Sequence, residues 1–123
     1  MDADFRARVA DIRKINPAYE ADAYPFLMEC FRYASGKRRQ SAKHHLKAAD
    51  ICDAVKNYAL DTFGPMAATV LGEWGIKSTR DIGAVVRGLV DAGVLIREEN
   101  DSYEEFDEVF DFNETFVLPY EPE

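Results

Sequence analysis

Three groups of side chains in this chain have the chemistry for catalysis or binding: two cysteines, two adjacent histidines, and a set of lysines and arginines. Cys30 and His45 are residue types that could act as nucleophile and base, but no Cys or Ser motif frames either of them. His44 and His45 are neighbours, so their side chains diverge on a helix and face opposite ways on a strand. The sequence therefore predicts no catalytic residue and no metal site, and it assigns no role to the two histidines.

The glycines and the acidic residues do not form a known type of ligand loop. Glycines between positions 64 and 93 fall at the ends of predicted helices or inside them, which does not match a phosphate-binding loop. The acidic run at 98–114 lacks the Asp order and the glycine of a calcium loop. We therefore expect a chain that binds a partner, is not an enzyme and holds no cofactor.

The cations that could contact nucleic acid or an acidic partner lie in two places. GKRRQSAKHHLK, at 36–47, is the only basic run, with five lysines and arginines and no acid. A second set lies on or just before a predicted helix at 79–92, where Arg80 and Arg87 are seven residues apart and share a face. The candidate contact residues are Lys37, Arg38, Arg39, Lys43, Lys47, Lys77, Arg80 and Arg87.

The charge of the chain is divided unevenly along its length. All 15 lysines and arginines lie within residues 1–97, whereas residues 98–123 hold 11 acids and no cation, and the chain as a whole carries −8. Asp81 and Asp91 add acids to the same helix as Arg80 and Arg87, which disfavours contact with phosphates. Because the acidic end is also rich in Phe and Tyr, we expect it to fold onto the body of the protein.

These charges favour a protein partner over nucleic acid. A basic partner could dock on the acidic segment, or the basic run of one copy could contact the acidic end of a second copy and form a homodimer. Nucleic-acid binding stays the alternative. The discriminating observation is whether the cations converge on one face free of acids, or whether the segment at 98–116 packs across the helix at 79–92.

The elements that must position these residues resemble a winged helix-turn-helix. MAATVLGEWGIKSTRDIGAVVRGLVDAGVLIR, at 66–97, reads as a short helix that ends at Gly75, a polar turn, and a second amphipathic helix that ends at Gly93. We predict a single, mainly α domain with two N-terminal helices at 1–35, a winged helix-turn-helix-like core at 44–112 and an acidic C-terminal segment at 113–123.

Helical spacing of apolar residues predicts helices at about 2–14, 22–35, 48–62, 65–74 and 79–92. The wing is expected to be a β-hairpin of 94–97 with 108–112, and residues 43–46 are a further candidate strand. Ser102 and Glu105 also form a capping-box pattern that allows one helical turn in the connection. Gly83 and Gly88, inside the last helix, indicate that another backbone approaches it closely.

The apolar pattern also predicts a core and a compartment. No apolar run approaches the ~20 residues that cross a bilayer, and the N-terminus is too charged for a signal peptide, so we expect a cytoplasmic protein that does not bind membranes. Cys30 and Cys52 are expected to be reduced and buried. The predicted core residues are Phe63, Met66, Leu71, Trp74, Ile76, Ile82, Val86, Leu89 and Leu95.

Most of the chain resembles an uncharacterised family of planctomycete and verrucomicrobial proteins of similar length. The most specific part is YALDTFGPMAATVLGEWGIKSTRDIG, supported by AYPFLMECFRYA near the N-terminus and VFDFNETF near the C-terminus. The family is richer in a His-Val-Ser/Thr-Gly pattern where this chain has His45-Leu46-Lys47-Ala48. The resemblance implies a bacterial protein and no particular catalytic or binding residue.

Overall fold

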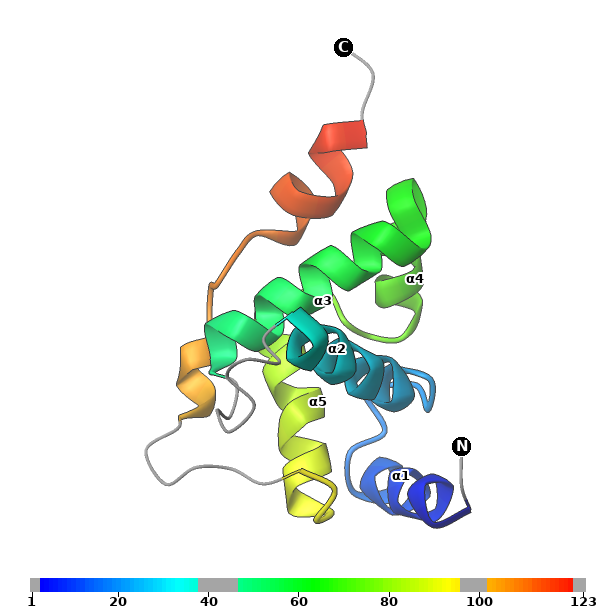
Figure 1. Cartoon of the computed structure of the whole chain (residues 1–123). Coiled ribbons are helices and arrows are strands. Elements are labelled where there is room, and N and C mark those ends of the chain that lie inside the picture. Colours follow the sequence, from blue (N-terminus) through cyan, green and yellow to red (C-terminus); the bar gives the residue numbers. More distant parts are fainter. Residues whose placement is uncertain (1–2, 38–46, 96–101, 121–123) are drawn as a thin grey trace.

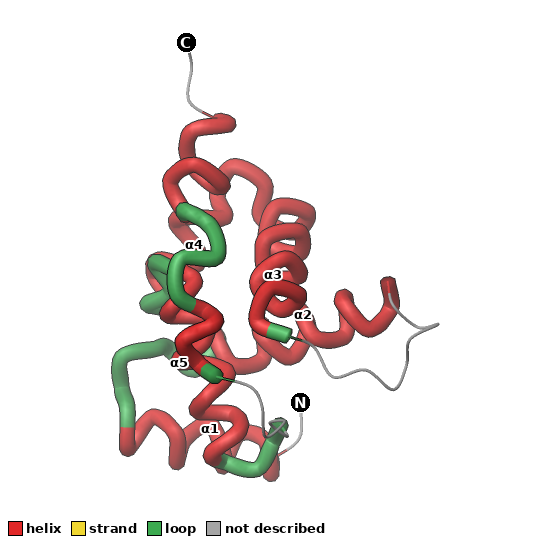
Figure 2. The backbone as a smooth tube through the Cα atoms, turned by 90° about the vertical axis from the view of Figure 1, so that its left-hand side faces the viewer, coloured by secondary structure: helices red, strands yellow, loops and turns green. Residues whose placement is uncertain are grey.

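The computed structural model describes residues 3–37, 47–95 and 102–120, and this part of the chain consists of helices joined by loops and turns, without a β-strand (Figures 1 and 2). None of the helices in these ranges is long and apolar enough to cross a membrane. The α-helices are α1 (Ala3–Ile15), α2 (Ala23–Lys37), α3 (Ala48–Phe63), α4 (Ala67–Glu73) and α5 (Thr79–Asp91).

The helices pack around α5 and α3. Helices α2 and α3 lie against each other, α5 contacts both of them, and α1 lies beside α5 at one end of the molecule (Figure 1). The side chains that these helices bury together include Leu27, Cys30, Val55, Ile82 and Leu89, each with none of its surface exposed. Burial of this continuous apolar surface is what stabilises the arrangement.

Local sequence features explain where the two helices of the helix-turn-helix begin and end. Gly75 adopts φ +92° after α4, a conformation that glycine tolerates, and a Cβ atom there would come within 2.5 Å of the Ala18 carbonyl oxygen. Ser78 caps α5, since its Oγ accepts a hydrogen bond of 3.3 Å from the Asp81 backbone N–H. The predicted order of a short helix, a polar turn and a second helix is therefore present.

The core prediction is confirmed at most of its positions. Leu71, Ile76, Ile82, Val86 and Leu89 are buried. The three predicted core residues that are only half-buried are Phe63, Trp74 and Leu95.

Met66 was predicted to be buried, and this is wrong because 54% of its surface is exposed. Gly64–Met66 forms a 3-10 turn, η2, before α4 begins. A 3-10 turn has ~3.0 residues per turn instead of ~3.6, so Met66 is out of register with the buried stripe of α4.

The predicted β-hairpin wing is wrong. The backbone N–H groups of Val94 and Leu95 both donate to the Leu89 carbonyl oxygen, at 2.9 and 3.2 Å, so they close the end of α5 and are not free to pair with a strand. Residues 108–110 form turns and bends, and Phe112 opens a helical turn. The candidate strand at 43–46 lies outside the described residues.

Residues 102–120 form three short helical turns instead. They are η3 (Tyr103–Phe106), the π-helical turn η4 (Asn113–Val117) and η5 (Leu118–Tyr120). The turn at η3 follows the predicted cap, because Ser102 Oγ accepts a 3.2 Å hydrogen bond from the Glu104 N–H. Phe106 and Phe116 are 5% and 1% exposed. The prediction that the acidic end folds onto the body is therefore confirmed for this part.

Candidate interaction site on helix α5

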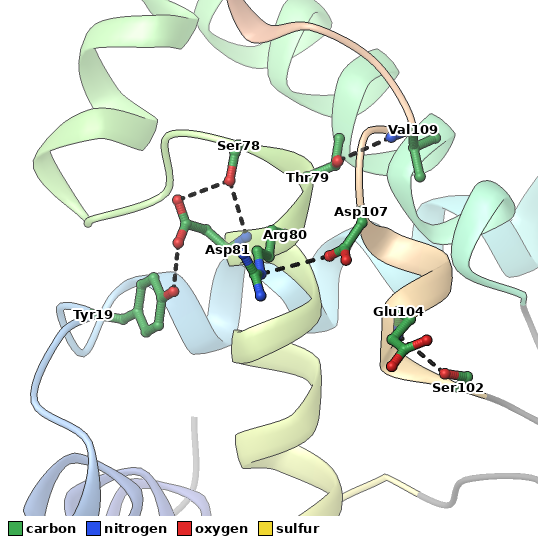
Figure 3. A network of polar contacts seen from close by, with 9 residues as sticks. All are labelled: Tyr19, Ser78, Thr79, Arg80, Asp81, Ser102, Glu104, Asp107 and Val109. Carbon is green, nitrogen blue, oxygen red and sulfur yellow. Dashed lines mark hydrogen bonds and ion pairs between the residues drawn. The ribbon is translucent and has the colours of Figure 1, made fainter.

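The first turn of α5 is fixed by a network centred on the Asp81 carboxylate (Figure 3). The Tyr19 hydroxyl donates to Asp81 Oδ1 at 2.6 Å, and the Lys77 backbone N–H donates to Oδ2 at 2.8 Å. A carboxylate in the first turn also interacts favourably with the helix dipole. Asp81 therefore serves to hold the 16–20 loop and the start of α5 together, a role that the charge argument from sequence missed.

Tyr19 is neutral in this network. Burial of the phenol raises its pKa well above its usual range, and the hydrogen bond to the negative Asp81 raises the pKa further. The neutral hydroxyl is the form that donates the proton to the carboxylate. The contact is thus maintained throughout the physiological pH range.

The residues from 102 to 114, which we call the acidic segment, lie across one side of α5 (Figure 1). Phe106 packs directly on Gly83, where an added Cβ would come within 2.7 Å of the Phe106 ring. The backbone N–H of Val109 donates to Thr79 Oγ1 at 3.1 Å, and Thr79 is 1% exposed (Figure 3). The segment is therefore bound to α5 by an apolar contact and by a buried hydrogen bond.

The predicted contact cations of α5 have intramolecular partners on this side. Arg80 Nε lies 3.6 Å from Asp107 Oδ1 (Figure 3). Arg87 lies over the Tyr103 ring, with its guanidinium carbon 5.4 Å from the ring centroid, and its Nε is 3.9 Å from Asp91 Oδ2. Each of these two exposed cations thus has an acid or an aromatic ring of the same chain beside it.

A mixed-charge hollow of about 750 Å³ remains between the acidic segment and the start of α5. Lys77 and Arg80 line one side, while Asp107 and Asp111 line the other. Phe110 and Phe112 form an apolar wall, with their rings stacked at 5.5 Å. This hollow is not the acid-free cationic face that a nucleic-acid interface requires.

The other predicted contact residues are placed only in part. Lys37 ends α2, and Lys47 precedes α3, where its backbone N–H donates to Asp50 Oδ2 at 3.2 Å. Outside the described residues lie Arg38, Arg39, Lys43, His44 and His45. Of the predicted contact residues, Arg80 and Arg87 thus lie on α5, and Lys77 lies just before its N-cap.

Both cysteines are buried with none of their surface exposed. Burial raises the pKa of the Cys30 thiol far above its usual range and that of Cys52 to about 12. A thiol in this state is protonated at neutral pH and is a poor nucleophile. The described residues also contain no group of three or more His, Cys, Asp or Glu side chains that could hold a metal ion.

Next to the side that the acidic segment covers, α5 borders a groove that the sequence did not predict. This groove, of about 720 Å³, lies between α1 and α5. Ile12, Tyr24 and Gly88 contribute to its floor, and the largely exposed Ile15 borders it. The only hint in the sequence is Ile15, an apolar residue at the end of α1 that continues the spacing of Ile12.

The predicted close approach of a backbone to the α5 glycines is wrong, since side chains make both contacts. Phe106 occupies the space at Gly83, and Ile12 occupies the space at Gly88, where an added Cβ would lie 2.9 Å from Ile12 Cγ2. A missing side chain on a helix leaves a notch, and a side chain from another element can fill that notch as well as a backbone can.

Comparison with known proteins found no match among protein families, curated proteins or solved structures. The resemblance to planctomycete and verrucomicrobial proteins stays a prediction. The contacts of α5 are therefore the basis for any functional conclusion.

Proposed function

We propose that this chain is a non-enzymatic protein-interaction module. The observation that carries the proposal is the position of the acidic segment across α5. A helix-turn-helix protein reads nucleic acid with its second helix, which must be free to enter a groove. Here Phe106 is seated on Gly83 and Asp107 lies beside Arg80, which favours another use for the scaffold.

The energetics of phosphate binding also support a protein partner. A nucleic-acid-binding domain commonly makes about six or more phosphate contacts. The described cations of this face are Arg80 and Arg87 on α5 and Lys77 just before the helix. The acidic segment adds Asp107 and Asp111 to the hollow that Lys77 and Arg80 line. Freeing this face would also expose Phe106, which is 5% accessible in the folded chain.

Nucleic-acid binding is the second candidate, and one observation favours it. The side chains of Arg80 and Arg87 are 82% and 66% exposed, so both guanidinium groups reach solvent. Surface ion pairs are weak, and a phosphate could replace Asp107 beside Arg80 without unfolding the chain.

Fluorescence anisotropy with labelled duplex DNA and single-stranded RNA, at ~50 mM and ~200 mM salt, tests the choice between these two functions. We expect no binding at either salt concentration. The proposal would be contradicted by binding that falls steeply with salt and weakens in the double variant Arg80→Ala, Arg87→Ala. Arg32→Ala is the matched control, because Arg32 is an exposed arginine of α2 that pairs with Glu29 in the same way.

A further inference from the structure

We draw no further inference here: the strongest candidate, the mixed-charge hollow between the start of α5 and the acidic segment, carries none, because Arg80 already pairs with Asp107, Ser78 and Asp81 already cap the start of the helix, and nothing in the part of the chain that the structure describes shows what would occupy the hollow.

Discussion

Helix α5 has a glycine on each of two sides, and different parts of the chain pack on these two glycines. At Gly83 the acidic segment covers the helix with Phe106, and at Gly88 helix α1 covers it with Ile12. The first side is further closed by the Thr79–Val109 hydrogen bond, whereas the second opens into a groove bordered by Ile15. Gly83 and Gly88 are five residues apart, which separates their directions by about 140° on a helix.

The comparison shows that exposed cations on a helix are not sufficient evidence for nucleic-acid binding. Arg80 and Arg87 occupy positions on α5 that suit a reading helix, yet the chain supplies Asp107 and Tyr103 as their partners. The groove between α1 and α5 has an apolar floor and shares Arg87 with the side that the acidic segment covers.

The largest effect should come from removing the side chain that closes the covered side. Phe106→Ala leaves a cavity over Gly83 and should lower the free energy of unfolding by about 3–5 kcal/mol. Urea denaturation followed by circular dichroism measures this change. Tyr120→Ala, at a position 46% exposed, is the control and should cost far less. Equal losses in the two variants would show that Phe106 is not buried on α5.

Adding one methyl group at Gly83 should have the next largest effect. The Cβ of Gly83→Ala would lie 2.7 Å from the Phe106 ring, so the acidic segment must shift, and we expect a loss of about 1–3 kcal/mol. Gly72→Ala is the matched control, because no atom lies within 4 Å of its new Cβ. The control should be stabilised by up to about 1 kcal/mol through helix propensity. Stabilisation of both variants in thermal unfolding would refute the close contact.

Helices and their ends were predictable because local residues determine them. Asn16-Pro17, Gly64-Pro65 and Gly75 interrupt apolar patterns at helical spacing, and Ser78 provides a cap, so the five α-helices follow from the sequence within a few residues. These features act within one turn of chain. They need no knowledge of what packs against the helix.

The secondary structure of the acidic segment was predicted incorrectly, because the spacing of its apolar residues fits a strand as well as a helical turn. Phe110 and Phe112 alternate as in a strand, but the residues expected to pair with them, Val94 and Leu95, bond to Leu89 at the end of α5. Without a partner strand, Phe110 and Phe112 stack on each other and on Phe116. The groove was missed for a related reason, since Ile15 and Gly88 meet only through the tertiary fold.

A moderate effect is expected from the hydrogen bond that ties the 16–20 loop to the start of α5. Tyr19→Phe removes the donor to Asp81 and should lower the free energy of unfolding by about 1.5–3 kcal/mol at pH 7. Because the pKa of Tyr19 is raised in the folded state above its ordinary 10.0, this contribution is fully present below pH 10.

The same contribution is lost as the pH rises through the raised pKa, because the unfolded chain then ionises first. Stability of the original chain should therefore fall more steeply above pH 10 than that of Tyr19→Phe. Urea denaturation at pH 7 and at pH values above 10 tests this. A difference between the two proteins that stays constant with pH would contradict the proposed state of Tyr19.

The smallest effect should come from the exposed ion pair over the covered side. Arg80 and Asp107 are 3.6 Å apart and partly solvated, so a double-mutant cycle with Arg80→Ala and Asp107→Ala should give a coupling energy of at most about 0.5 kcal/mol. A coupling of several kcal/mol would mean that charge, and not Phe106, holds the acidic segment in place.

The central claim is that the acidic segment is part of the fold and covers one side of α5. Amide hydrogen exchange of the ¹⁵N-labelled chain, followed by two-dimensional NMR, tests it most directly. We predict that the Val109 amide, which donates to the buried Thr79 Oγ1, exchanges as slowly as the amides of α5. Exchange of the Val109 amide at the rate of an unfolded chain would contradict the claim.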